Sequence, residues 1–131
     1  MVKETHWLDR LSVEDLDLFA QKHGFKRKGR HNWIRRTPEF VQLVNLQKSQ
    51  WSPEVRYLNF ALWPLALGEP PTIAESKFQF RTRAEQFRVD DLASFFSRTD
   101  ELGTLAQLRD AEAAGLSGLM SKTLRALLPQ T

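Results

Sequence analysis

The strongest chemical signal in this sequence is a run of cationic side chains without an acidic neighbour. Between Lys22 and Arg36 the chain carries seven Lys or Arg residues and no Asp or Glu. Six of them are candidate anion-binding residues: Lys26, Arg27, Lys28, Arg30, Arg35 and Arg36. Such a cluster could contact the phosphates of a nucleic acid, with Trp33 and Trp51 as stacking faces for bases. The alternative is the solvated edge of a sheet, where Lys and Arg prevent pairing with another strand.

A second signal comes from amide side chains in segments that have the composition of strands. Asn45, Gln47 and Asn59 run against strand propensity, so each of these amides needs a polar partner. They could converge on a ligand from neighbouring strands, with Arg81 or Arg83 donating charge-assisted hydrogen bonds to a carboxylate or phosphate. The alternative is an internal amide network that satisfies backbone groups of the protein itself.

No pattern in the sequence indicates catalysis, a cofactor or a metal site. The chain has no Cys, and its three His residues show none of the known metal-binding motifs. Residues 115–118 miss the spacing of a nucleophile elbow by one position, and no phosphate-binding loop occurs. We therefore expect no catalytic residue, no metal ion and no cofactor.

Length and composition fit one ordinary globular domain. At 131 residues, with 41% hydrophobic and 27% charged residues, the chain can bury a core without disulfides or metal ions. The first residues lack the apolar centre of a signal peptide, and no apolar run approaches the roughly 20 residues that a membrane helix needs. We expect a single domain over residues 1–131, located in the cytoplasm and without a membrane partner.

Local patterns predict an α+β fold. Ser12 can cap a helix over residues 12–23, and Gly24 suits the left-handed conformation that follows a helix. Alternating apolar segments then predict an antiparallel meander of three to four strands over residues 30–83. From residue 89 to 128 the apolar period is helical, which predicts three C-terminal helices packed on one sheet face.

The clearest helical pattern is an apolar stripe from Leu116 to Leu128, which Pro129 ends. Its spacing of three and four residues predicts a helix whose apolar side packs in the core. A dimer seam is the alternative interpretation of the same stripe. We expect a monomer or a weak dimer.

Alternation within the two central strands predicts their register. Asn59 lies on the face opposite the apolar residues of its strand. If this strand pairs antiparallel with the preceding one, residues whose numbers sum to about 104 lie opposite one another. That register places Gln47 near Tyr57 and Asn45 near Asn59. The strand over residues 40–48 alternates less regularly, which indicates either a bulge or a strand covered on both faces.

Several short motifs occur together in the order of a known family: Gly24-Phe25-Lys26-Arg27-Lys28-Gly29, Asn45-Leu46-Gln47-Lys48-Ser49, Asn59 and Arg81-Thr82-Arg83. In these motifs the chain resembles the bacterial domain-of-unknown-function family numbered 4304, over roughly Leu16 to Gln86. It departs from that family after Arg83, where Ala84 and Glu85 replace a branched aliphatic residue and Gly. The resemblance implies an α+β domain with a strand meander, adds Lys48 to the candidate residues, and implies no known reaction.

The candidate ligand-binding residues are the strand amides, the nearby cations and one aromatic residue in a polar loop: Asn45, Gln47, Lys48, Trp51, Asn59, Arg81 and Arg83. We expect a non-enzymatic binding module that holds an anionic or polar partner on a basic hairpin and an amide-lined sheet face. The partner could be a nucleic acid, a phosphate-bearing ligand or a protein. Two other possibilities stay open, an immunity-like protein-interaction domain and an enzyme with an unrecognised site.

Overall fold

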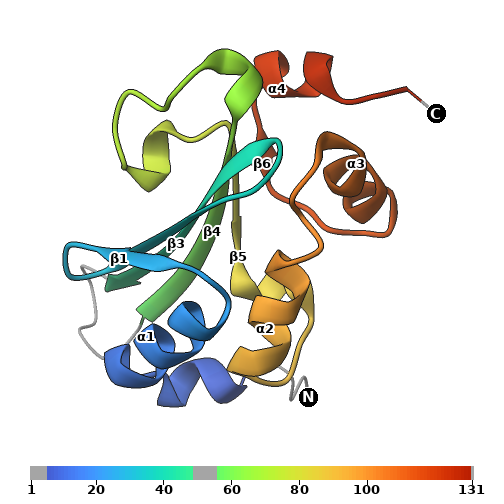
Figure 1. Ribbon diagram of the computed structural model, residues 1–131. Coiled ribbons are helices and arrows are strands. Elements are labelled where there is room, and N and C mark those ends of the chain that lie inside the picture. Colours follow the sequence, from blue (N-terminus) through green and yellow to red (C-terminus); the bar gives the residue numbers. More distant parts are fainter. Residues whose placement is uncertain (1–5, 49–55, 131) are drawn as a thin grey trace.

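The computed structural model describes residues 6–48 and 56–130. Six strands form one antiparallel sheet in which every strand lies beside its predecessor in the chain (Figure 1). The strands are β1 (Lys26–Lys28), β2 (Asn32–Arg36), β3 (Phe40–Lys48), β4 (Arg56–Pro64), β5 (Phe80–Arg83) and β6 (Leu119–Met120). The predicted α+β meander is confirmed, with a short strand added at each edge.

The helices occupy the places that the sequence predicts, before and after the meander. The four α-helices are α1 (Val13–Lys22), α2 (Leu92–Thr99), α3 (Leu105–Ala113) and α4 (Lys122–Leu127). Short 3₁₀ turns, labelled η, lie before α1 at η1 (His6–Arg10), between β4 and β5 at η2 (Leu65–Leu67) and η3 (Glu75–Lys77), and between β5 and α2 at η4 (Ala84–Phe87).

The first helix begins and ends at the residues that the sequence indicates. The Ser12 hydroxyl accepts a hydrogen bond from the Asp15 backbone N–H at 3.1 Å. After the helix, Gly24 has a φ of +85°, and the Phe25 N–H donates to the Ala20 carbonyl at 2.9 Å. This geometry turns the chain directly into β1 and buries the Phe25 side chain against the core.

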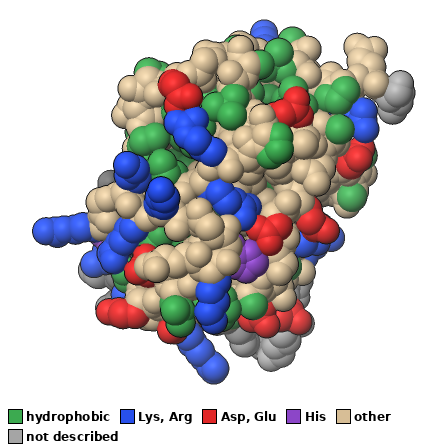
Figure 2. All heavy atoms as spheres, in the orientation of Figure 1, with side chains coloured by type: hydrophobic (Ala, Val, Ile, Leu, Met, Phe, Trp, Pro, Cys, Tyr) green, Lys and Arg blue, Asp and Glu red, His purple; other side chains and the backbone are tan. Residues whose placement is uncertain are grey.

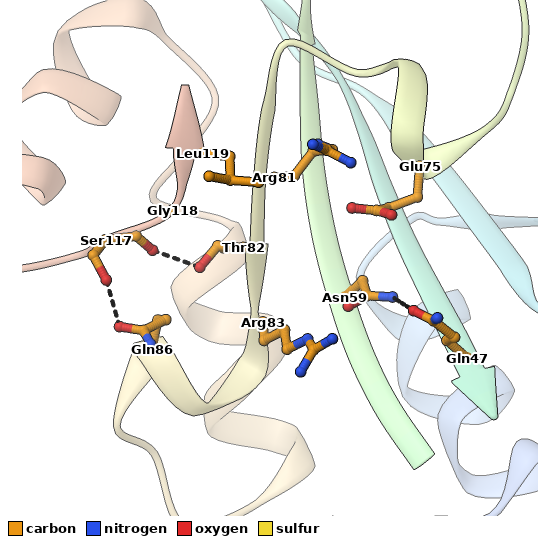
Figure 3. A pocket seen from close by; sticks show the side chains of 10 residues that line it. All are labelled: Gln47, Asn59, Glu75, Arg81, Thr82, Arg83, Gln86, Ser117, Gly118 and Leu119. Carbon is orange, nitrogen blue, oxygen red and sulfur yellow. Dashed lines mark hydrogen bonds between the residues drawn. The ribbon is translucent and has the colours of Figure 1, made fainter. Parts of the chain in front are cut away.

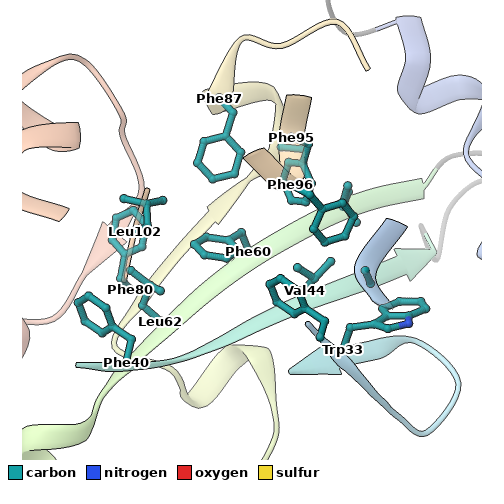
Figure 4. Packing of buried hydrophobic residues seen from close by; sticks show 14 of the residues in the cluster. Trp33, Phe40, Val44, Phe60, Leu62, Phe80, Phe87, Phe95, Phe96 and Leu102 are labelled. Carbon is teal, nitrogen blue, oxygen red and sulfur yellow. The ribbon is translucent and has the colours of Figure 1, made fainter. Parts of the chain in front are cut away.

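The sheet has two faces. The inner face carries Val44 and Phe60 and is covered by all four α-helices. The outer face carries Asn45 and Asn59. On the inner face, aromatic rings from β4 and α2 form the centre of the core (Figure 4). The rings of Phe95 and Phe96 are 5.1 Å apart between centroids, and both residues are fully buried.

Half of the outer face is also apolar, and the segment over residues 65–79 covers it. Here Val41, Leu43, Ala61, Trp63 and Phe78 form a second buried cluster. The pairing of β3 with β4 continues without interruption from Phe40↔Pro64 to Lys48↔Arg56. The irregular alternation of β3 therefore comes from cover on both faces and not from a bulge.

The predicted helix over the stripe from Leu116 to Leu128 is wrong in its first half. Leu119 and Met120 form β6 beside β5, and α4 begins only at Lys122, after Ser121 caps it. Leu119 is 64% exposed, so an apolar residue at helical spacing here marks an edge strand. The second half of the stripe does pack in the core, where Leu124 is fully buried.

We predict that Leu124→Asp lowers the free energy of unfolding by about 3 kcal/mol or more, because it places a carboxylate without a partner in the core. Thr123→Asp is the matched control, since Thr123 is the exposed neighbour in α4. Thermal and urea unfolding of the two variants measure the difference. Equal stability of Leu124→Asp and the parent would show that α4 does not pack in the core.

Candidate functional site

The outer face of the sheet carries a row of polar side chains that crosses four strands. The register pairs Asn32 with Asn45, Asn45 with Asn59, and Asn59 with Arg83. Gln47 pairs with Tyr57 one row further along. The predicted register of β3 and β4 is thus confirmed. Since directly paired residues share a face, these side chains lie together on the half of the outer face that the segment over residues 65–79 does not occupy.

Hydrogen bonds fix the amides of this row in one orientation. The Nδ2 of Asn59 donates to the Oδ1 of Asn45 at 2.9 Å and to the Oε1 of Gln47 at 3.0 Å. The Nδ2 of Asn45 donates in turn to the Oδ1 of Asn32 at 2.7 Å. Asn59 is only 4% exposed, whereas Gln47 reaches the solvent. Within the described part of the chain, the Oδ1 of Asn59 accepts no hydrogen bond.

A shallow open pocket of about 530 Å³ lies beside this row, around β5 (Figure 3). Four of the predicted ligand-binding residues line it: Gln47, Asn59, Arg81 and Arg83. Asn45 does not line the pocket but holds Asn59 in place. The remaining lining residues come from η3, from β5 and η4, and from the segment that enters β6: Glu75, Thr82, Gln86, Ser117, Gly118 and Leu119.

The two arginines of β5 supply the positive charge of the pocket. Arg81 and Arg83 are two residues apart on the strand, so their side chains leave from the same face. Neither guanidinium takes part in an ion pair with the described residues. The guanidinium carbon of Arg83 lies 3.9 Å from the centre of the Tyr57 ring. Stacking on an aromatic ring fixes the plane of a guanidinium while its N–H donors stay available at the edge.

Hydrogen bonds from side chains hold the far wall of the pocket against β5. The Thr82 hydroxyl donates to the Ser117 carbonyl at 2.6 Å, and the Ser117 hydroxyl donates to the Gln86 Oε1 at 2.6 Å. Gly118 permits the close approach, because a Cβ at this position would lie 2.6 Å from the Arg81 carbonyl oxygen. This wall has no counterpart in the predicted site, since sequence alone does not reveal that residues 117–119 return to β5.

The cationic run divides into exposed and internally bonded side chains. Lys26, Lys28 and Arg30 are exposed, and Lys and Arg side chains gather over the β1–β2 hairpin in Figure 2. Lys28 pairs with Asn32, which places it at the end of the outer polar row. Arg27 is exposed but donates to the Arg30 carbonyl at 2.8 Å. The hairpin therefore contributes a basic edge to the same face as the pocket.

Two predicted anion-binding residues have carboxylate partners within the protein. Arg35 lies on the inner face, where it donates to Gln42, to the His23 carbonyl and to Asp100. Arg36 forms an ion pair with Glu69, and the hydrogen bond lowers the pKa of that carboxyl and raises the pKa of Arg36. These contacts occupy the donors that an external anion would need.

Three other predicted residues lie away from the pocket or outside the described chain. Trp33 is fully buried and donates to Asp17 at 2.8 Å, so its expected role as a stacking face for bases is wrong. That hydrogen bond is the main reason why the pKa of Asp17 lies below its usual value. Lys48 is exposed but has the strand parity of the inner face. Trp51 lies outside the described residues.

The described residues hold no group of three or more His, Asp or Glu side chains that could bind a metal ion. None of the helices in residues 6–48 and 56–130 is long and apolar enough to cross a membrane.

Comparison with known proteins yields one match. A family model described as "Domain of unknown function (DUF4304)" matches residues 17–125, which takes in the whole sheet and all the residues that line the pocket. The match extends well past Gln86, where the sequence resemblance appeared to end. No curated protein and no solved structure matches the chain.

We predict that Gly118→Ala lowers the free energy of unfolding by about 1–3 kcal/mol, because its Cβ would overlap the Arg81 carbonyl and the Phe80 ring. Ser117→Ala is the control, since it removes an exposed hydroxyl without adding an atom next to β5, and it should change stability by about 1 kcal/mol or less. Urea unfolding measures both variants. A Gly118→Ala protein as stable as the parent would mean that the wall is not held close to the strand.

Proposed function

Because the chain belongs to the domain-of-unknown-function family DUF4304, whose description names no activity, we propose its function from the site itself. The protein is a binding module that holds an anionic ligand, a carboxylate or a phosphate, in the pocket beside β5. The observation that carries the proposal is the pair Arg81 and Arg83, two guanidinium groups on one face that have no carboxylate partner among the described residues.

Half of the ten other arginines contrast with this pair. These five form ion pairs with carboxylates: Arg35, Arg36, Arg98, Arg109 and Arg125. Arg81 and Arg83 instead leave the strand about 7 Å apart, the rise of two residues, and line the same pocket. At that spacing both guanidinium groups can donate to one carboxylate or phosphate.

The neighbouring amides favour binding because they are already ordered. Asn59 is held by two acceptors and Arg83 by the Tyr57 ring, so a ligand orders few side chains when it enters. Preorganised groups of this kind raise affinity, because little conformational entropy is lost on binding. Lys26 and Lys28 extend the positive potential across the same face and attract anions over a longer range.

The chemistry of the lining residues supports binding over catalysis. Among the described lining residues, Ser117 carries an exposed hydroxyl, which donates to the Gln86 amide oxygen. An amide does not accept the proton of a nucleophile as His or a carboxylate does. The two alternatives are an enzyme with an unrecognised site around Asn45, Gln47, Asn59 and Arg81 and an immunity-like protein-interaction domain.

We predict that inorganic phosphate, titrated into labelled protein, shifts the backbone NMR signals of residues 59, 81 and 83. The double variant Arg81→Gln/Arg83→Gln should bind phosphate about tenfold more weakly or not at all, because both charge-assisted contacts are lost. Arg10→Gln/Lys122→Gln is the control, with the same change of net charge at two exposed residues outside the pocket. Equal phosphate affinity in the two double variants contradicts the proposed site.

The basic hairpin is tested separately. We predict that Lys26→Gln/Lys28→Gln/Arg30→Gln elutes from heparin at lower salt than the parent and keeps its stability, since exposed charges contribute little to folding. The matched triple variant Arg10→Gln/Lys77→Gln/Lys122→Gln should elute close to the parent if position matters and not only net charge. Identical elution of both triple variants would show that the hairpin is a solvated strand edge and not a specific anion-binding surface.

A further inference from the structure

One acidic side chain enters the arginine-lined pocket. Glu75, in η3, lines the pocket together with Arg81 and Arg83. Figure 3 shows its carboxylate directed into the same space as the guanidinium of Arg81, above Asn59. An anion-binding pocket gains nothing from an additional carboxylate, because like charges repel and lower the affinity for the ligand.

No side-chain contact among residues 6–48 and 56–130 explains the position of Glu75. Its carboxylate is in none of the ion pairs among the described residues, for which the limit is an N···O distance of 4.0 Å. Its side chain also makes no hydrogen bond with them, whereas its backbone carbonyl accepts from the Phe78 N–H. The pocket therefore presents two guanidinium groups and one carboxylate that do not neutralise one another by direct contact.

The hydrogen-bonding groups of the pocket are also of two kinds, donors that need an acceptor and acceptors that need a donor. Arg81 and Arg83 offer donors without acceptors. Glu75 and the Oδ1 of Asn59 offer acceptors without donors within the described part of the chain. A carboxylate would satisfy the arginines but has no proton to donate to Glu75 or Asn59, and phosphate can donate an O–H but brings no positive charge to Glu75. A protonated amine supplies up to three N–H donors and a positive charge.

We propose that the ligand is a zwitterion of the amino-acid or short-peptide class, with its carboxylate at Arg81 and Arg83 and its ammonium group at Glu75. This inference rests on the proposed function, since it presumes that the arginines hold an anion. A volume of about 530 Å³ exceeds what a single small amino acid fills, so a dipeptide is a fitting first probe. The opposed charges then select for ligands that carry both groups, because each missing group leaves a charge of the pocket without a partner.

The test compares alanyl-alanine with N-acetyl-alanyl-alanine, which keeps the carboxylate but lacks the ammonium group. By NMR titration or calorimetry, the parent should bind the free dipeptide about fivefold more tightly than the acetylated one. Glu75→Gln should remove this preference by weakening only the free dipeptide. Glu14→Gln is the control for net charge, because Glu14 is exposed on α1, away from the pocket.

The possible failures can be told apart. Equal affinity of the parent for the two dipeptides overturns the zwitterion while the arginine site stands. An equal loss of both dipeptides in Glu75→Gln also overturns it, because Glu75 would then act on the shape of the pocket and not on the ammonium group. If neither dipeptide nor phosphate binds the parent, the proposed function fails together with the inference.

Discussion

The side chain of Gln42 is fully buried in the middle of β3, and the attachment of the helices to the sheet depends on its hydrogen bonds. Its Nε2 donates at 2.7 Å to the carbonyl of Thr99, the last residue of α2, and at 3.1 Å to the carbonyl of Leu102, just past that helix. Its Oε1 accepts from the Nε and Nη2 of Arg35 at 2.8 and 2.6 Å. All four hydrogen-bonding positions of the amide are thus occupied. Without it, the Leu102 carbonyl would lose its hydrogen bond, at a penalty of about 1–3 kcal/mol for an unsatisfied buried group, while the Thr99 carbonyl and Arg35 would keep their other partners.

Arg35 extends this network to a second helix. It also donates to Asp100 and to the His23 carbonyl, and the His23 ring stacks on Phe96. The ends of α1 and α2 are therefore joined on the inner face of β2 and β3. Because the helices are fixed on that face, the polar row on the outer face has no helix to satisfy it, and its amides bond to one another. The inner face binds the helices and the outer face carries the polar row because of the side of each strand on which its polar residues lie.

Much of this arrangement follows from local sequence, and the rest depends on contacts between distant segments. The parity of Asn45 and Asn59 is enough to predict their pairing, and Ser12 and Gly24 mark the ends of α1, because both signals act within a few residues. The strands β1 and β6 are too short to show alternation, and the apolar stripe from Leu116 also fits a helix. The roles of Arg35 and Arg81 could not be distinguished beforehand, since only the fold places Asp100 beside one and not the other. Glu75, Ser117 and Gly118 reach the pocket from loops, where spacing carries no information about position.

The order of the strands also bears on how the molecule assembles. Each strand from β2 to β5 pairs with the one before it, so most of the sheet can grow from the β3–β4 hairpin by closing loops shorter than the one that precedes β6. Only the pairing of Arg81 with Leu119 encloses a long segment, which contains α2 and α3. Closure of a long loop loses more chain entropy than closure of a short one, so we expect β6 to join the sheet last and to detach first. The wall of the pocket can therefore open by local unfolding while the five-stranded sheet beneath it stays intact.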